Sequence, residues 1–218
     1  MLKENYEKIL KEISNGNNLG EKISLLGATK FVEVEKINEA ISLGLCHIGE
    51  NKAQEFRDKF PLYKPCITHF IGTLQENKIK YVVGKADIID SVSSIKLAKA
   101  IGEKAKKLSI KQKVMIEINA GDEESKTGAS IEEAKAVYKS IIELNSLELV
   151  GVMGMLPKTQ DEEILTSSCK ILRGFYDEIR AKTPSVIYLS VGMSLDYKIA
   201  IRNGSNMIRI GTSLFGSR

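Results

Sequence analysis

The sequence predicts an α/β fold, a single (β/α)8 TIM barrel that follows a leading N-terminal helix. Three observations favour it. Eight short apolar runs rich in β-branched residues recur along the chain, and each is followed by a segment with apolar residues at helical spacing. The 218 residues also fit one such barrel, so we expect residues 1–218 to form a single domain. An open doubly wound sheet with fewer strands is the alternative that the pattern leaves open.

The predicted elements alternate in order along the chain. Residues 1–14, MLKENYEKILKEIS, place Ile and Leu at helical spacing between charges. Strands are then predicted at Ile23–Ala28, Leu45–Ile48, His69–Ile71, Ile88–Val92, Lys113–Ile118, Leu149–Val152, Val186–Val191 and Met207–Ile210. Helices are predicted between them at Val34–Leu43, Asn51–Phe60, Ile95–Leu108, Ile131–Leu144 and Ile164–Lys182. Ser130 and Glu133, three residues apart, form the pattern of a capping box that begins the helix at Ile131.

Composition and charge narrow the class of protein. Hydrophobic residues make up 43% and charged residues 28%, as in ordinary globular proteins. No apolar run approaches the roughly 20 residues of a membrane span, and the N-terminus lacks the apolar stretch of a secretory signal, so we expect a cytoplasmic protein that does not contact membranes. The net charge of +4 is spread over many lysines without a basic block interleaved with aromatics. This disfavours nucleic acid as a partner and favours a phosphorylated small molecule.

Metal and thiol chemistry are not indicated. Cys46, Cys66 and Cys169 stand singly, with no C-x-x-C pair and no metal-ligand spacing to His47 or His69. We therefore expect no metal, and three reduced, buried thiols. The sequence also lacks a P-loop, an H-E-x-x-H site and a G-x-G-x-x-G fingerprint, and its order of residues suggests no Ser-His-Asp arrangement.

The barrel predicts that functional residues follow the strands, because the βα loops open onto one face. Gly27-Ala28-Thr29-Lys30 follows the first strand and places a lysine amine at the barrel mouth. An amine beside low-dielectric walls loses its proton more easily and becomes a nucleophile toward an aldehyde. On position alone, a solvated surface lysine is the alternative.

The last two strands end in glycine and hydroxyl residues. Arg209-Ile210-Gly211-Thr212 closes the eighth strand, and Gly192-Met193-Ser194 follows the seventh. Loops at these positions are the customary phosphate site of the fold, where backbone N–H groups face the anion. We therefore predict a phosphate cup that includes Ser194, Gly211 and Thr212. Simple turns and helix caps are the alternative for either loop taken alone.

Arg209 suggests the remaining part of the ligand. An arginine pointing into the top of the barrel would be a fixed cation that donates to a pyridine nitrogen without protonating it. Together with the lysine and the phosphate cup, this arrangement fits pyridoxal 5'-phosphate (PLP) bound as a Schiff base on Lys30. A salt bridge across the barrel is the alternative role for Arg209.

The ends of the second and third strands carry further polar residues. Asn51 and Gln75 offer neutral hydrogen bonds suited to a ring hydroxyl or a water molecule. Glu50 and Glu76 are assigned to first helical turns, where they complement the helix dipole. His69 is expected to begin its strand, away from the mouth, and to have a structural role.

Six ordered motifs carry a resemblance to a known family. They are GATK (27–30), GENKAQE (49–55), HFIGTLQENK (69–78), ESKTG (124–128), VGMSLD (191–196) and MIRIGTSLFG (207–216). With them the chain resembles the PLP homeostasis protein family (YggS/PROSC type), single-domain relatives of the alanine racemase N-terminal barrel. The sequence departs from the common pattern at Phe31, where Thr is usual, and at Thr73, where Pro is usual.

The resemblance implies a set of roles. Lys30 would carry PLP, Arg209 would face the pyridine nitrogen, and Ser194, Gly211 and Thr212 would hold the phosphate. Asn51 and Met193 would line the cofactor.

The resemblance also implies an activity. Alanine racemase uses a second domain and a partner-subunit tyrosine as the opposing acid and base, whereas this sequence ends just after the phosphate loop. We therefore expect a non-catalytic, monomeric carrier and buffer of PLP in vitamin B6 homeostasis, with apo PLP-dependent enzymes as recipients. A weak amino-acid racemase and a Schiff-base aldolase-type barrel enzyme are the alternatives.

Lys126, in the ESKTG motif, is hypothesised to swing over the mouth and assist PLP transfer. The alternative is that Lys126 is a solvated loop lysine without such a role.

Overall fold

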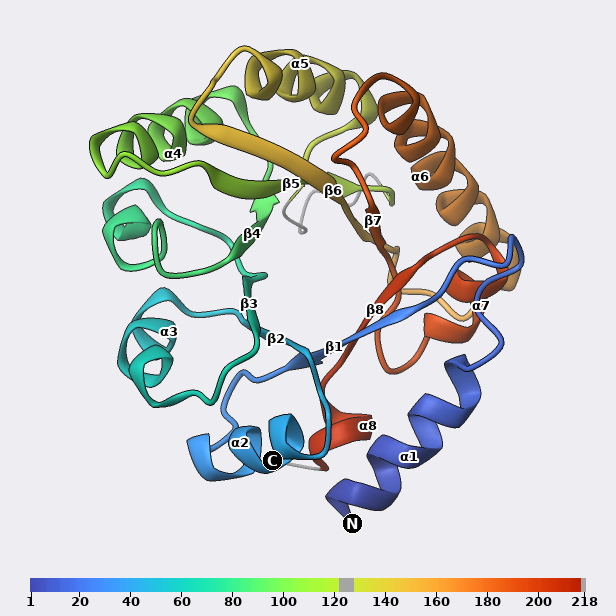
Figure 1. Ribbon diagram of the computed structural model, residues 1–218. Coiled ribbons are helices and arrows are strands. Elements are labelled where there is room, and N and C mark those ends of the chain that lie inside the picture. The colour runs from blue at the N-terminus through green and yellow to red at the C-terminus, as the bar shows by residue number, and fades with distance from the viewer. Residues whose placement is uncertain (122–127, 217–218) are drawn as a thin grey trace.

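The computed structural model describes residues 1–121 and 128–216. Eight parallel strands close into a barrel in chain order (Figure 1). They are β1 (Ser24–Ala28), β2 (His47–Glu50), β3 (Ile67–Phe70), β4 (Ile88–Val92), β5 (Gln112–Asn119), β6 (Leu147–Met155), β7 (Tyr188–Ser190) and β8 (Met207–Ile210). The predicted (β/α)8 barrel is confirmed, and the open sheet is excluded.

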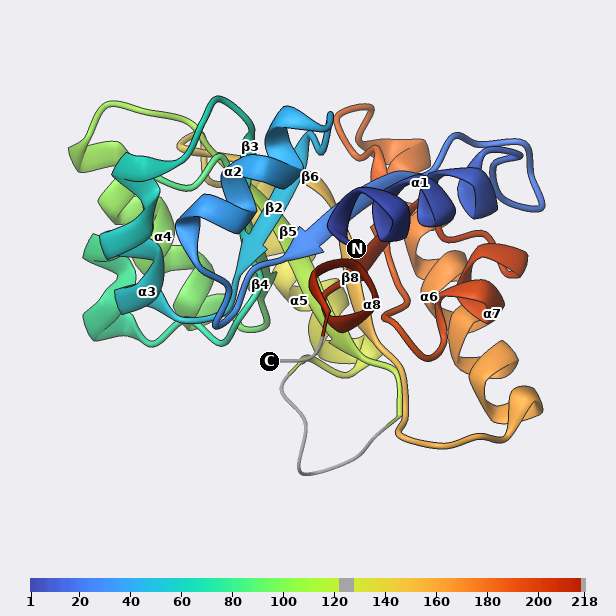
Figure 2. The ribbon, with the colours of Figure 1, turned by 90° about the horizontal axis from the view of Figure 1, so that it is seen from below.

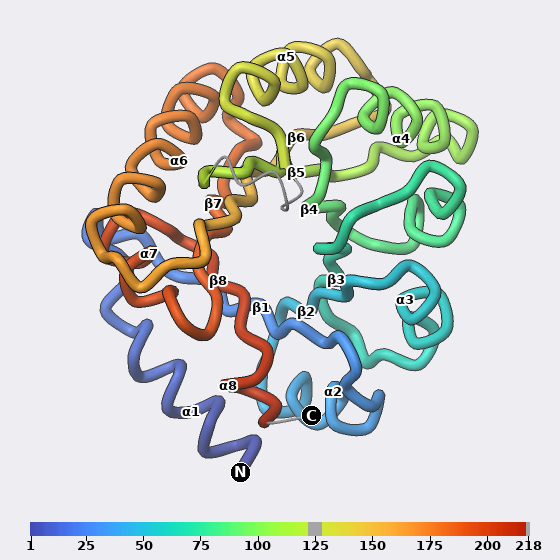
Figure 3. The backbone as a smooth tube through the Cα atoms, turned by 180° about the vertical axis from the view of Figure 1, so that it is seen from behind, coloured from blue at the N-terminus to red at the C-terminus, as the bar shows by residue number. Residues whose placement is uncertain are grey.

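Helices form a ring outside the strands (Figure 3). They are α1 (Leu2–Ile13), α2 (Val34–Ser42), α3 (Ala53–Lys59), α4 (Ile95–Lys107), α5 (Ile131–Ile142), α6 (Glu162–Lys182), α7 (Tyr197–Arg202) and α8 (Thr212–Phe215), with 3-10 turns η1 (Phe60–Leu62) and η2 (Glu76–Tyr81). The capping box before α5 is confirmed, since Glu133 N donates to Ser130 Oγ at 3.3 Å and Ser130 N to Glu133 Oε2 at 2.8 Å. Between β3 and β4, η2 stands in place of a full α-helix.

The main cores lie between the barrel wall and the helices. One cluster packs the apolar faces of α3 to α6 onto the strands, and a second packs α1, α2 and α8 against β1, β2 and β8. In the second cluster α1 lies beside α8, with Asn5 Nδ2 donating to Leu214 O at 3.2 Å (Figure 2). A small apolar cluster of Ile88, Met115, Val150 and Met153 fills part of the barrel interior. The leading helix therefore braces the end of the chain that follows β8.

The barrel interior also holds a chain of hydrogen-bonded polar groups. His47 Nδ1 lies 3.0 Å from His69 Nε2, and His69 Nδ1 lies 2.9 Å from Asp90 Oδ1. Burial, followed by the charge of His69, lowers the pKa of His47 to about 4, so His47 is neutral at pH 7. The prediction that His69 begins its strand is wrong. The strand begins two residues earlier, at Ile67, and this places the His69 side chain inside the barrel.

The three thiols differ in exposure. All three cysteines are free, but only Cys169 is buried, while Cys66 is half-buried and Cys46 is exposed. The prediction of buried thiols is therefore wrong for two of them, because Cys46 and Cys66 immediately precede β2 and β3 at the rim of the barrel.

Within residues 1–121 and 128–216, no cluster of His, Cys, Asp and Glu is arranged to hold a metal. No helix in these ranges is long and apolar enough to cross a membrane.

Glu21 connects the loop before β1 to α6. Its carboxylate lies 2.7 Å from Arg173 Nη1, from Arg180 Nη1 and from Asn17 Nδ2. Burial alone would raise the pKa of Glu21, but hydrogen bonds from these three side chains outweigh it and lower the pKa to about 2. The ionised carboxylate therefore ties the N-terminal segment to the longest helix.

We expect Glu21→Gln to lower the free energy of unfolding at pH 7 by about 2 kcal/mol, measured by urea denaturation. Because the folded-state pKa is lowered, this contribution is present above pH 4.5 and is lost as the pH falls from about 5 toward 2. The variant should therefore lose less stability than the wild type between these pH values. Glu178→Gln, in an exposed pair with Lys182, is the control and should change little. Identical pH profiles for Glu21→Gln and the wild type would contradict this assignment.

Candidate functional site

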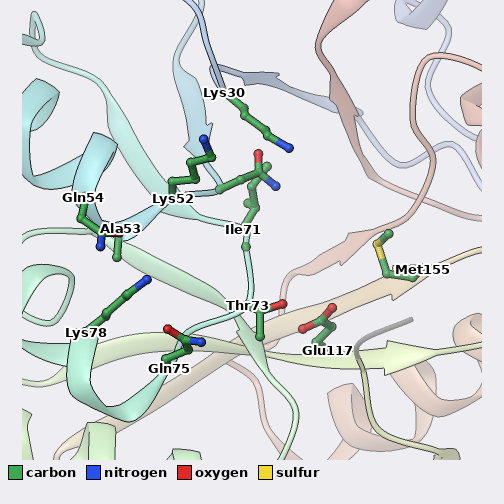
Figure 4. A pocket seen from close by; sticks show the side chains of 12 residues that line it. Lys30, Lys52, Ala53, Gln54, Ile71, Thr73, Gln75, Lys78, Glu117 and Met155 are labelled. Carbon is green, nitrogen blue, oxygen red and sulfur yellow. The ribbon is translucent and has the colours of Figure 1, made fainter. Parts of the chain in front are cut away.

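The end of β1 delivers Lys30 to the barrel mouth. Thr29 continues the strand pairing, because its N–H donates to Gly49 O at 2.9 Å and its hydroxyl donates to the same oxygen at 3.1 Å. Side chains alternate along a strand, so Leu26 and Ala28 lie on the same face of β1, and Lys30 follows in the turn beyond the strand. Leu26 is fully buried beside Gly49 of β2. The Lys30 side chain is half-buried and points into the mouth of the barrel (Figure 4).

Glu50 joins the ends of β1 and β2. One carboxylate oxygen accepts hydrogen bonds from Asn51 N at 2.7 Å and Lys52 N at 3.2 Å, and the other accepts from the Thr29 hydroxyl at 3.3 Å. Burial raises the pKa of Glu50, against the lowering effect of the Asn51 N–H and the Lys59 charge. The sequence-based assignment of Glu50 to a helical turn is wrong, since Glu50 ends β2 and α3 begins at Ala53. Its contacts fix the backbone on both sides of the mouth.

A cavity of about 600 Å³ opens where Lys30 projects (Figure 4). This volume is typical of sites for small molecules. Its lining comes from the ends of β1, β2, β3, β5 and β6, and consists of Lys30, Asn51, Lys52, Ala53, Gln54, Ile71, Gly72, Thr73, Gln75, Lys78, Glu117 and Met155. Gly72 allows the second and third loops to meet, because a Cβ there would lie 2.0 Å from Asn51 O.

The cavity contains three lysines and one buried glutamate, Glu117. Lys52 Nζ is engaged, lying 3.2 Å from Glu55 Oε1 and 4.0 Å from the centroid of the Phe31 ring. Lys30 Nζ lies 5.1 Å from the same ring. Within the described ranges, neither Lys30 nor Lys78 forms an ion pair with a carboxylate.

Arg209 is a buried cation held by main-chain oxygens. Its Nη1 donates to Ser190 O at 2.6 Å and to Ser190 Oγ at 2.9 Å, while Nη2 donates to Gly154 O at 3.0 Å. Nη2 also lies 3.4 Å from the sulfur of Met155, which lines the cavity. Burial lowers the pKa of Arg209, against the opposing effect of the Asp90 and Glu117 charges. No described carboxylate pairs with it directly, so the alternative of a salt bridge across the barrel is not observed.

The loop after β7 is a tight turn. Gly192 has φ of 100°, and a Cβ there would lie 2.7 Å from Tyr197 Cα, so the position requires glycine. Arg209 N donates to Gly192 O at 3.0 Å, and Met193 N donates to Asp196 Oδ1 at 2.5 Å. These bonds hold the loop after β7 beside β8.

Comparison with known proteins identifies the family. Residues 8–218 match the family described as alanine racemase, N-terminal domain. The chain is 38% identical over 218 residues to the pyridoxal phosphate homeostasis protein of Aquifex aeolicus, covering 99% of this chain and 94% of that relative. The chain belongs to the pyridoxal phosphate homeostasis protein family. The resemblance inferred from the motifs is therefore confirmed.

Solved structures of a similar protein agree with the fold. PipY of Synechococcus elongatus PCC7942 is 26% identical to this chain. Its structure without PLP has a TM-score of 0.89, covering 99% of this chain and 100% of PipY. Its structure with PLP bound has a TM-score of 0.83, covering 97% and 100%. The likeness therefore extends across nearly the whole barrel.

The structure of this homeostasis family member brings together part of the predicted site. Lys30 and Asn51 line one cavity, and Arg209 lies behind its lining, where it contacts Met155. The other four predicted residues follow β7 and β8 and lie outside the cavity lining: Met193, Ser194, Gly211 and Thr212. Ser194 instead lines a second cavity of about 290 Å³ beside α1, together with Ser213. Lys126 falls outside the described residues.

Sequence reasoning missed several residues that line the cavity. Glu117 alternates with apolar residues inside a predicted strand, and this period-2 pattern was the signal that it faces the same side as Met115. Lys78 lies at the end of a motif noted above, but its place in the cavity depends on a 3-10 turn that periodicity does not reveal.

We expect Arg209→Leu to lower the free energy of unfolding of the protein without bound ligand by about 3 kcal/mol at pH 7, because two buried carbonyls lose their donors. Urea denaturation measures the change. Arg202→Leu, in an exposed ion pair with Glu162, is the control and should change stability by no more than about 0.5 kcal/mol. Equal stability of Arg209→Leu and the wild type would show that the main-chain bonds of Arg209 do not support the barrel.

Proposed function

We propose that this protein binds PLP as a Schiff base on Lys30 and acts as its carrier and buffer in intracellular vitamin B6 homeostasis. The observation that carries the proposal is the placement of Lys30. It is half-buried in the wall of a cavity of small-molecule size, without an ion-pair partner among the described residues. The curated names of the relatives, and the PipY structure with PLP bound, support PLP as the ligand.

The residues present fit this cofactor. When bound, PLP supplies an aldehyde that combines reversibly with an amine. Lys30 provides the amine, and its position at the mouth leaves the nitrogen facing the cavity. Arg209 is fixed by Ser190 and Gly154, so its guanidinium is a preorganised cation for the pyridine nitrogen. Asn51 contributes a neutral amide to the same cavity.

We assign the phosphate to the loops after β7 and β8. The tight turn at Gly192 presents Met193 and Ser194, and Gly211 precedes α8 with Thr212 exposed beside it. In this assignment backbone N–H groups and the two hydroxyls hold the anion, and Met193 lines the cofactor. The cofactor would then extend from Lys30 toward the β7 and β8 side of the mouth.

We favour a protein that carries PLP without catalysing a reaction of amino acids. Racemisation needs proton donors and acceptors on both faces of the α-carbon. The described lining of the cavity offers lysines and Glu117 as titratable groups, and no tyrosine or histidine. We propose that the protein acts as a monomer in the cytoplasm and hands PLP to apo PLP-dependent enzymes. Weak racemisation is the alternative, and α-proton exchange above free PLP in deuterated water would support it.

The Lys30→Ala variant should lose the visible absorption band that the purified, PLP-loaded wild type is expected to show. The loss is expected because the proposed Schiff base is on Lys30, at the end of β1, whereas the other lysines of the described lining are Lys52, paired with Glu55, and Lys78, which follows β3. Lys80→Ala is the matched control, since Lys80 is exposed and outside the cavity lining, and it should keep the band. A full band in Lys30→Ala would refute the assignment of the tether. A colourless wild type that traps a sugar phosphate on Lys30 would favour the aldolase-type alternative.

Handover gives a separate test of the carrier role. Loaded wild-type protein should restore activity to an apo PLP-dependent enzyme, followed by the activity of that recipient. Lys30→Ala, exposed to the same PLP and freed of unbound ligand, should restore little. Failure of the loaded wild type to release PLP to any recipient would argue against a carrier, while leaving the Schiff base intact.

A further inference from the structure

One wall of the Lys30 cavity is polar and belongs to no part of the proposed cofactor site. It is formed by the loop after β3 and the start of η2, which contribute Thr73, Gln75 and Lys78, together with Gln54 of α3 (Figure 4). The proposed phosphate residues follow β7 and β8, outside this lining. We call these four residues the β3 wall. A bound PLP that points from Lys30 toward β7 and β8 leaves the β3 wall open.

Among the described lining residues, Lys78 is the available cation of this cavity. Lys30 is the cofactor tether in the proposed function, and Lys52 is engaged by Glu55 and the Phe31 ring. The carboxylate nearest to Lys78 in the sequence, that of Glu76, lies 2.6 Å from Lys96 Nζ. Lys78 makes no ion pair with a described residue, although it is half-buried in the cavity lining.

The local fold holds Lys78 in place. Its backbone N–H donates to Gln75 O at 2.9 Å, and the next residue, Ile79, is buried in the core. The 3-10 turn therefore fixes the backbone of Lys78 next to the main-chain carbonyl of Gln75. Such a cation, accompanied by neutral amides and a hydroxyl, is suited to a carboxylate.

The charges of the cavity select the kind of carboxylate. Glu117 also lines the cavity, from β5. A doubly charged anion bound there in addition to the PLP phosphate would therefore be repelled by the buried Glu117 carboxylate. A molecule with both an amine and a carboxylate matches a cavity that has cations and one anion. An amine is also the group that can replace Lys30 on the cofactor carbon.

We propose that the β3 wall is a subsite for the carboxylate of an α-amino acid whose amine exchanges with Lys30. The inference rests on the proposed function. In the exchange, the amino-acid nitrogen bonds to the carbon held by Lys30, the bond from that carbon to Lys30 Nζ breaks, and a proton passes from the incoming nitrogen to the departing one. No oxidant or reductant is required. The amino acid would thereby free the cofactor from its tether.

The test compares two amines that differ in the carboxylate. PLP-loaded wild type, Lys78→Gln, Lys78→Arg and Lys80→Gln are each titrated with L-alanine and with L-alaninamide, and the visible band reports the exchange. We expect the preference for L-alanine to fall about tenfold in Lys78→Gln, which corresponds to about 1.4 kcal/mol. Lys78→Arg should keep most of it, and Lys80→Gln should match the wild type. An unchanged preference in Lys78→Gln overturns the inference.

A second readout does not involve the loaded protein. Calorimetry of propionate with the cofactor-free protein should give binding that Lys78→Gln loses and Lys80→Gln keeps. Inorganic phosphate should compete with propionate less well than L-alanine does, and stronger competition by phosphate would overturn the inference in favour of a phosphate subsite.

The two proposals fail in different ways. Absence of the visible band from the PLP-treated wild type would refute the proposed function itself, whereas an intact band with no effect of Lys78→Gln refutes only the subsite.

Discussion

The arrangement of the strand ends at the barrel mouth depends on a buried cation that donates hydrogen bonds to the backbone. Arg209 extends from β8 and donates to main-chain oxygens of β6 and β7, at Gly154 and Ser190. A cation at 5% exposure is tolerated because those oxygens replace water around it and because Asp90 and Glu117 supply negative charge within the barrel. The strands that carry the proposed phosphate loops are thereby held in one arrangement before any ligand arrives.

On the other side of β1, the carboxylate of Glu50 likewise holds neighbouring strand ends together. Glu50 accepts from the backbone of Asn51 and Lys52 and from the Thr29 hydroxyl, and it therefore sets the spacing of the β1 and β2 ends. Lys30 lies between this support and Arg209. A flexible amine on a rigid rim is suited to a bond that forms and breaks, since the loops around it need not rearrange.

Sequence reasoning predicted the fold more completely than the site. The strands at Ile88–Val92 and Met207–Ile210 were predicted to the residue, because β-branched runs bounded by loops leave little ambiguity. The site depends on side-chain direction and on irregular turns. Lys78 was missed because η2 has no apolar period, and His69 was misplaced because Ile67 and Thr68 precede it in the strand. The position of Lys30 at the mouth was predicted because it lies two residues after an identifiable strand, and Lys30 does line the cavity.

The most direct measurement is to locate the lysine that carries the cofactor. Borohydride reduction of the PLP-loaded protein fixes the Schiff base as a stable adduct, and mass spectrometry of the digested protein then identifies the modified residue. We predict a single major adduct on Lys30, because β1 lies next to β8 and its proposed phosphate loop, whereas Lys78, in the same cavity, follows β3. An adduct on Lys52 or Lys78, with Lys30 unmodified, would contradict the account.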